Sequence, residues 1–276
     1  MNINWFPGHM TKSLRMMEDI IKLVDAVIYV LDARAAFSCI NPALNEIAKN
    51  KPIIYVLNKI DLITNQDKDK IIARLKSGSK TVIPLNSTAS KAGNILSGEI
   101  KKLCIEKIEK AFNRGIKTSI RAMVVGIPNS GKSTLVNNLC GRAAAKAGNK
   151  AGVTRGKQWI KIDDYFEVLD TPGTLYPKIV DQTIAKRLAF IGSINDDILD
   201  KEWLSLELIS ELDAVNTSYI TQKYTVLEGD PILRLEQIAR SRGFLGKGGE
   251  VDISKGAVAI IDDFRKGRLG KIALET

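Results

Sequence analysis

The sequence predicts an α/β fold with a mostly parallel sheet, followed by a second region that is all-helical. Short apolar runs rich in β-branched residues alternate with helical periodicities as far as residue 170, and each run ends in polar residues. After Pro177 the β-rich runs stop and helical periodicity takes over. We therefore expect two domains, 1–179 and 180–276, with a boundary near 178–182.

The elements expected within this fold follow in chain order. A first helix over 11–24 carries apolar residues at steps of three and four. The expected strands are 25–34, 52–59, 80–87, 120–126, 158–163 and 165–170. The expected helices between them are 42–50, 66–76, 94–114 and 131–140. In the second domain we expect helices joined by a Gly-rich turn within 238–252.

Composition narrows the class of protein. The chain has 276 residues, of which 45% are hydrophobic and 26% charged, so disorder as the main state is excluded. Its three cysteines, Cys39, Cys104 and Cys140, are widely spaced, which favours free thiols in a reducing compartment. The start has no apolar signal region, and no apolar run is long enough to span a membrane. We expect a cytoplasmic protein that does not associate with membranes.

Positive charge is concentrated in one part of the chain. The net charge is +10, but 1–179 holds 28 Lys and Arg against 15 Asp and Glu, and 180–276 holds 13 against 16. Between 101 and 161 there are 14 basic and 2 acidic residues. Such a segment is typical of a surface that binds RNA, although a solvated charged surface is an equally ordinary explanation.

A phosphate-binding loop is the most specific motif. Residues 126–133 read GIPNSGKS and match G-x-x-x-x-G-K-[ST] between an expected strand and an expected helix. Backbone N–H groups of such a loop surround phosphate oxygens, Lys132 reaches the β and γ phosphates, and Ser133 binds Mg²⁺. The residues expected to contact the nucleotide here are Asn129, Ser130, Gly131, Lys132, Ser133 and Thr134.

A second motif indicates guanine. Asn58, Lys59 and Asp61 form N-K-x-D at the end of an apolar strand, where open α/β sheets bind ligands. The Asp61 carboxylate can accept from guanine N1–H and the N2 amine, whereas adenine would leave it unpaired. Asn86 and Ser87, at the end of the next strand, are expected to contact the base, although an ordinary polar turn fits them equally well.

A third motif, D-x-x-G, ends the strand 165–170. Asp170 is expected to hold Mg²⁺ through water, and the Gly173 N–H to face the γ-phosphate. Thr154, upstream in a Gly- and Ala-rich loop, is the candidate switch threonine that closes on the same Mg²⁺. Mg²⁺ is thus an expected cofactor, held by Ser133, Thr154 and Asp170.

The order of these motifs differs from that of a Ras-like domain. There the phosphate loop (G1), switch threonine (G2) and D-x-x-G (G3) precede N-K-x-D (G4) and the base loop (G5). Here the order is G4-G5-G1-G2-G3, so the chain resembles circularly permuted, Ras-like P-loop GTPases of the TRAFAC class. With WFPGHM at 5–10, LNKIDL, GIPNSGKST and DTPGTLYPK, it closely resembles the ribosome biogenesis GTPase A family. The resemblance is strong over 1–180 and rests on layout and length alone beyond it.

The resemblance implies a GTP-hydrolysing assembly factor for the large ribosomal subunit in bacteria or organelles, slow alone and stimulated by the ribosomal particle. Its partners would be GTP, GDP and a large-subunit precursor of rRNA and ribosomal proteins, bound by a monomer whose helical domain contacts RNA. A GTP-dependent RNA-binding scaffold with negligible hydrolysis, and a GTPase serving a non-ribosomal enzyme, remain alternatives.

Catalytic residues are less clearly indicated. Thr174 stands where Ras-like enzymes carry the glutamine that orients water, so His9, the chain's single histidine, is the candidate that positions the attacking water. Packing against Trp5 or contact with a partner would also explain His9. Asn129 resembles the phosphate-loop asparagine of GTPases that coordinate K⁺, although a polar loop residue would look the same.

Overall fold

The computed structural model describes residues 3, 8–76, 80–146, 159–175, 179–225 and 229–276. For Gly8, His9, 142–146 and Lys247 it describes the backbone alone. In this part of the chain no helix combines the length and apolarity that crossing a bilayer requires.

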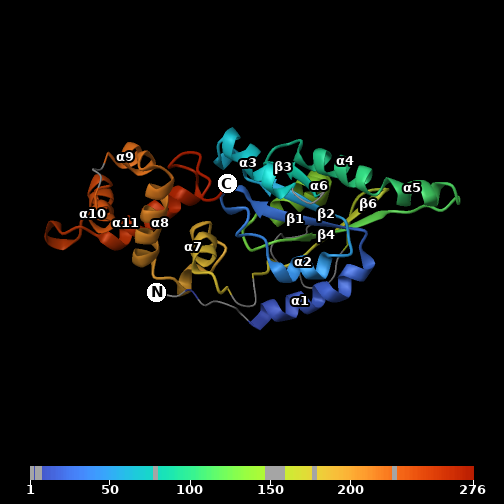
Figure 1. Ribbon diagram of the computed structural model, residues 1–276, viewed down its shortest axis with the longest axis horizontal. Helices are drawn as coiled ribbons and strands as arrows, with labels where there is room; N and C mark the ends of the chain where they lie inside the picture. Colours follow the sequence, from blue (N-terminus) through green and yellow to red (C-terminus); the bar gives the residue numbers. More distant parts are fainter. Residues whose placement is uncertain (1–2, 4–7, 77–79, 147–158, 176–178, 226–228) are drawn as a thin grey trace.

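A six-stranded sheet forms the centre of the larger part of the molecule (Figure 1). Its strands are β1 (Ala26–Asp32), β2 (Ile53–Asn58), β3 (Thr81–Pro84), β4 (Ile120–Val125), β5 (Trp159–Asp163) and β6 (Phe166–Asp170). They lie in the order β3-β2-β1-β4-β6-β5, and every neighbouring pair is parallel except β5 with β6. The α/β class and the mostly parallel sheet are confirmed.

Helices cover both faces of this sheet, and alternate residues of β1 face each layer. Ala26, Ile28 and Val30 join a buried cluster with the helices α4 and α6, whereas Val27 and Tyr29 join the cluster of α1 and α2. Burial on both faces explains the unbroken apolar run of β1. The helices and short 3₁₀ turns of this part are α1 (Gly8–Ile20), η1 (Ile21–Leu23), η2 (Ala33–Ala35), α2 (Pro42–Ala48), η3 (Ile60–Leu62), α3 (Asn65–Leu75), α4 (Ala92–Leu103), α5 (Ile105–Phe112) and α6 (Lys132–Lys146).

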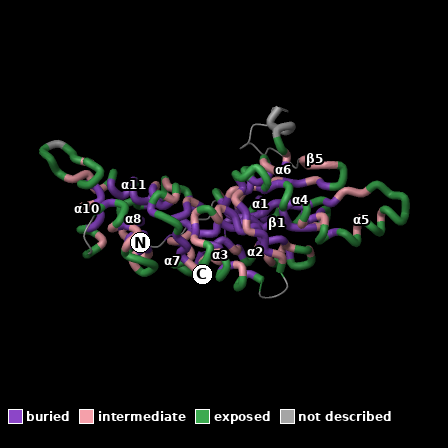
Figure 2. Tube along the Cα trace, turned by 90° about the horizontal axis from the view of Figure 1, so that it is seen from above, coloured by how far each residue is buried: buried purple, intermediate pink, exposed green. Residues whose placement is uncertain are grey.

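The single helix predicted over 94–114 is wrong, because the chain bends at Cys104 into two helices. Leu96 and Ile100 of α4 are fully buried, whereas none of residues 105–112, all of which are described, is buried. The tube in Figure 2 shows α5 extending beyond the sheet. The amphipathic pattern continues across the bend, so periodicity could not reveal it.

In the described part of the second region, from 179 onward, every named element is a helix or 3₁₀ turn, with one isolated bridge between Leu245 and Val251. These elements are α7 (Gln182–Phe190), η4 (Asp196–Ile198), α8 (Lys201–Asn216), α9 (Ser218–Tyr224), α10 (Pro231–Ser241), η5 (Lys247–Gly249) and α11 (Ile253–Arg265). Four of them begin after an aspartate whose carboxylate accepts from the first turn, namely Asp181, Asp200, Asp230 and Asp252. The all-helical character of this region is confirmed.

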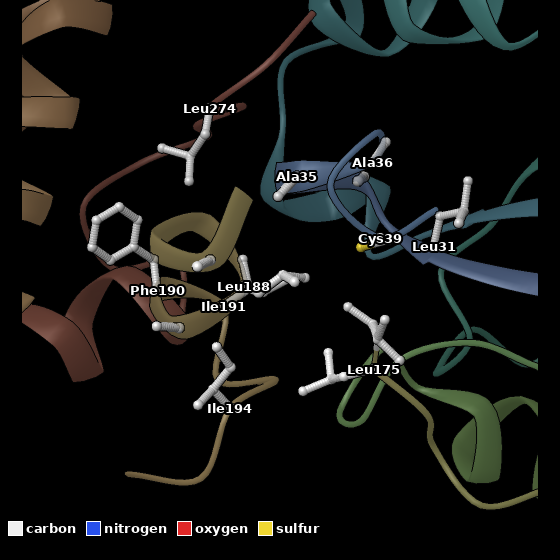
Figure 3. Close-up of a cluster of buried hydrophobic side chains, with 14 of the residues drawn as sticks. Leu31, Ala35, Ala36, Cys39, Leu175, Leu188, Phe190, Ile191, Ile194 and Leu274 are labelled. Atoms are coloured by element: carbon white, nitrogen blue, oxygen red, sulfur yellow. The ribbon is translucent and has the colours of Figure 1, made fainter. Parts of the chain in front are cut away.

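One apolar cluster continues from the sheet into the helical region. Leu188 and Phe190 of α7 belong to the same buried cluster as Leu31 of β1 and Leu175, which follows β6 (Figure 3). Residues 266–276 then run back to the sheet, where the Ile272 N–H donates to Leu62 O and the Leu274 N–H to Arg34 O, each at 2.8 Å. The helical region is therefore joined to the sheet by a shared core and by this returning segment.

Candidate functional site

The phosphate loop lies between β4 and α6, as its motif predicts. Gly126 has φ +147°, and a Cβ there would lie 2.5 Å from Val30 O. Gly131 has φ +98°, and a Cβ there would lie 2.2 Å from Asn58 Nδ2. Side chains rarely adopt such φ values, so both positions require glycine. The loop can therefore lie close against β1 and the N-K-x-D segment.

Lys132 is the first residue of α6 and is buried behind this loop. Its Nζ donates to Ile127 O at 2.7 Å. Burial lowers the pKa of Lys132 from its usual 10.5 to about 8, against the opposing charge of Asp170. A phosphate beside Nζ would supply the negative charge that this desolvated ammonium lacks. Thr134, two residues on, is exposed.

The residues expected to hold Mg²⁺ meet beside the loop. Ser133 Oγ donates to Asp170 Oδ2 at 3.2 Å. Asp170 Oδ1 is buried and accepts no hydrogen bond from the described residues, and burial raises the pKa of this carboxyl. A hard cation bound between these oxygens would satisfy the orphaned atom and favour the carboxylate, so the oxygen donors fit Mg²⁺. Thr154 lies outside the described residues.

Asn58 links the two halves of the expected nucleotide site. Its Oδ1 accepts from Ser87 N–H at 2.9 Å and Ser87 Oγ at 2.7 Å, while its Nδ2 donates to Ser130 O at 2.8 Å. The base loop and the phosphate loop are thus held by one amide side chain. Asp61 lies in η3, the next turn of the chain, with an exposed side chain.

The base loop after β3 has its own support from α6. Asn86 Oδ1 accepts from Thr88 N–H at 2.9 Å, which closes a local turn. Asn138 of α6 donates to Ser87 O at 3.2 Å and to Ala89 O at 2.8 Å. Ser87 is buried, whereas a solvated turn would leave it exposed. The loop is therefore held by Asn58 from one side and by Asn138 from the other.

Lys59 occupies a strained position between the loops. Its backbone is left-handed, with φ +61°. Its Nζ donates to Asn129 O at 2.7 Å and lies 2.8 Å from Asp32 Oδ2. Asn129 is left-handed too, with φ +58°, and its Nδ2 donates to Gly192 O at 2.6 Å.

The segment after D-x-x-G lies directly against the phosphate loop. A Cβ on Gly173 would approach Pro128 Cα to 2.8 Å and Lys132 Nζ to 2.9 Å. The Thr174 N–H donates to Gly126 O at 3.1 Å. A γ-phosphate added beside Lys132 would therefore meet this segment at once, which is the geometry a nucleotide-sensing switch requires.

The first helix begins beside this switch segment. The Leu175 N–H donates to Met10 Sδ at 3.4 Å, and both residues are buried. His9 precedes Met10 in α1, but its side chain lies outside the described atoms. The backbone thus brings the first turn of α1, which begins at Gly8, to the residue that follows Thr174.

Sequence reasoning missed Asp32, Arg34 and the Gly192–Ser193 turn. Asp32 ends β1 at the edge where Asn58 ends β2, and their Cα atoms are paired in register. That shared edge was a usable signal, since polar residues ending adjacent parallel strands meet. No sequence signal indicated Gly192 and Ser193, because their approach depends on how the helical region docks.

Three comparisons bear on this geometry. The family model described as 50S ribosome-binding GTPase matches residues 121–218. The Ribosome biogenesis GTPase A of Bacillus cereus is 38% identical over 100% of this chain and 94% of its own length. The Mitochondrial ribosome-associated GTPase 1 of Mus musculus is 31% identical over 98% of this chain and 89% of its own.

Solved structures agree in fold. GNP-bound YlqF from T. maritima has a TM-score of 0.65 and 27% identity, covering 96% of this chain and 97% of that one. The GDP-bound form has the same TM-score and identity over 95% and 98%.

The sheet order, with the phosphate loop after the central β4 and the guanine motif after β2, defines a circularly permuted GTPase of the Ras-like P-loop class. Its match to relatives above 30% identity spans the whole chain. The chain belongs to the ribosome biogenesis GTPase A family, and it is a GTPase that binds guanine nucleotides.

Proposed function

We propose that this GTPase assists assembly of the large ribosomal subunit, binding its precursor in a nucleotide-dependent way. The observation that carries the proposal is that relatives named for ribosome biogenesis match the chain from end to end, helical region included. Its partners are rRNA and ribosomal proteins of the precursor particle, it acts in the cytoplasm, and it works as a monomer. The relatives' names also favour hydrolysis over a scaffold role.

The nucleotide is held by the two loops that Asn58 links. In this proposal Asp61 reads the guanine edge, with Asn86 and Ser87 beside the base. The phosphate loop cradles the phosphates through Lys132 and backbone N–H groups. Support comes from the buried, desolvated ammonium of Lys132 and from the glycine-dependent approach of the loop to Asn58.

Mg²⁺ is assigned to Ser133 and Asp170, with Thr154 closing from the switch loop. The ion would neutralise phosphate charge and orient the nucleotide. K⁺ is assigned to Asn129. Because the Asn129 amide donates to Gly192 O, binding of K⁺ and docking of the helical region involve the same side chain. Equal turnover in NaCl and KCl would exclude the K⁺ assignment.

His9 is assigned the positioning of the attacking water. The support is that Thr174 replaces the usual glutamine and that α1 meets the switch segment at Met10 and Leu175. An imidazole with an ordinary pKa near neutrality can orient a water or accept its proton.

RNA contact is assigned to the basic surface of 101–161 and to the helical region. Some positive side chains of the 101–161 segment form ion pairs within the protein. Lys107 pairs with Asp25 at 2.6 Å, and Arg121 pairs with Glu167 at 3.0 Å. Arg114 and Lys117 are exposed and extend the surface. Binding to RNA should therefore weaken steeply as salt is raised.

Co-sedimentation with large-subunit precursors tests the proposal. We expect more bound protein with a non-hydrolysable GTP analogue than with GDP, and faster GTP hydrolysis when particles are added. Equal association in both nucleotide states, with unchanged hydrolysis, would contradict it.

A further inference from the structure

A closed ring of polar contacts joins the phosphate loop to the helical region, and it begins and ends at Asn129. Lys59 Nζ donates to Asn129 O at 2.7 Å on one side and meets Asp32 Oδ2 at 2.8 Å on the other. Asp32 is fully buried at the end of β1. The guanine motif is therefore tied to a carboxylate outside the nucleotide motifs.

Arg34 carries the ring from Asp32 to the helical region. Its Nε and Nη2 donate to the two carboxylate oxygens of Asp32 at 3.0 and 2.7 Å. Its Nη1 donates to Phe264 O at 3.3 Å and Arg265 O at 3.1 Å, the last carbonyls of α11. A cation at a helix C-terminus is favourable, because these carbonyls lack helical partners.

The charges in this cluster depend on one another. Both side chains of the Asp32–Arg34 pair are almost wholly buried, at 1% and 2% exposure. Burial alone would raise the pKa of Asp32, but the charges of Arg34 and Lys59 hold this pKa well below its usual range. A buried ion pair that loses one partner leaves an uncompensated charge, so neither Lys59 nor Arg34 can leave without disturbing the other.

Arg265 closes the ring from the other side. Its Nε donates to Phe190 O at 3.0 Å and its Nη2 to Ala189 O at 2.8 Å, at the end of α7. Two residues further, Gly192 O accepts from Asn129 Nδ2 at 2.6 Å, and Ser193 Oγ donates to Pro128 O at 2.8 Å. The contacts of Arg265 therefore lead from α11, through the end of α7, back to the phosphate loop.

We propose that Arg34 is a positioning residue for nucleotide retention, which holds Lys59 and the phosphate loop in place through the docked helical region. The inference rests on the nucleotide site of the proposed function and adds a regulation to it. Undocking α11 frees Arg34, loosens Lys59 and the loop, and speeds nucleotide release. By linkage, a partner that pulls on the helical region lowers nucleotide affinity, and bound nucleotide strengthens docking.

The test measures release of fluorescently labelled GDP from the full chain. Arg34→Lys keeps a charge beside Asp32, but one ammonium cannot reproduce the bidentate pair and also reach α11. Arg265→Gln cuts the ring on the opposite side. We expect each variant to release GDP about tenfold faster, equivalent to about 1.4 kcal/mol. Because either cut opens the same ring, the double variant should release no faster than about twofold beyond the singles.

Arg240→Gln is the matched control. Arg240 pairs with Glu236 along the exposed side of α10, outside the ring, so its GDP release should equal that of the unmodified protein. Single-turnover hydrolysis of bound GTP should stay within about twofold in every variant. A variant that releases GDP faster and also loses single-turnover hydrolysis would indicate general damage to the site. That result would overturn a positioning role.

The proposal would be overturned if the increases in GDP release of the two single variants multiply in the double variant. It would also be overturned if either single variant releases GDP at the rate of the control. If Arg34→Lys does not fold, Arg265→Gln alone still tests the ring, because Arg265 joins α11 to the end of α7 through Phe190 O and Ala189 O and lies outside the nucleotide motifs. GDP release at the control rate in that variant would overturn the proposal. An unmodified protein that binds no guanine nucleotide would instead refute the nucleotide site itself.

Discussion

Replacing Lys132 with methionine should stabilise the nucleotide-free protein while removing its hold on nucleotide. Burial lowers the pKa of Lys132 from 10.5 to about 8, a net effect that already includes the attraction of Asp170. A lowering of this size costs the folded state about 3 kcal/mol at pH 7. The lost hydrogen bond to Ile127 O offsets about 1 kcal/mol, and that carbonyl still accepts from Ser130 Oγ at 3.0 Å. We expect the free energy of unfolding to rise by about 2 kcal/mol.

The pH dependence of stability separates this effect from a change in packing, because only the buried charge makes the stability difference depend on pH. Because the folded protein holds the Lys132 proton less tightly than the unfolded chain, the penalty is fully present below about pH 8 and disappears as the pH rises toward 10.5. Urea unfolding of the nucleotide-free protein at pH 7 and pH 9.5 should therefore show the advantage of Lys132→Met shrinking. Lys110→Met, on the exposed surface of α5, is the control and should change stability by at most about 0.5 kcal/mol.

A Lys132→Met protein less stable than the unmodified one at pH 7 would refute the reasoning. An advantage that is the same at both pH values would do so too, because it would come from packing and not from the buried charge.

The remaining predictions concern single positions. Asn58→Ala removes three buried hydrogen bonds and should cost about 3 kcal/mol of stability and weaken GDP binding, measured by urea unfolding and calorimetry; unchanged binding would show that the two loops do not need the link. Gly131→Ala should abolish GDP binding, because its φ is +98° and the new Cβ would lie 2.2 Å from Asn58 Nδ2. Gly98→Ala, exposed in α4 with open space around it, should instead stabilise by about 0.5–1 kcal/mol, and a loss of melting temperature would contradict this. His9→Ala should bind GTP normally but lose about 10²- to 10⁴-fold in turnover on the ribosomal particle, and undiminished turnover would remove His9 from the mechanism.

Local patterns were sufficient to predict the sheet and the motifs. The run ending at Asn58 is apolar because its strand is covered on both faces. Consecutive residues of the sequence therefore show that this strand is buried. The phosphate loop could be predicted for the same reason. Its glycines are required by the backbone conformation of the loop itself, which depends on adjacent residues.

Features set by docking could not be predicted in the same way. The bend at Cys104 interrupts no periodicity, and no pattern near Arg265 indicates that it binds Asp196 at 2.7 Å and the end of α7. Arg34 contacts α11 across 230 residues of chain. Such long-range partners depend on the whole assembly of helices, and no local pattern encodes them.

The segment 272–275 has a consequence for biosynthesis. It binds Leu62, Arg34 and Ser38, which the ribosome makes more than 200 residues earlier. Translation therefore produces the guanine motif more than 200 residues before one of its supports. A nascent chain holds its early strands without that support until this segment emerges, so we expect nucleotide binding to be acquired only then, in one step with the docking of α11.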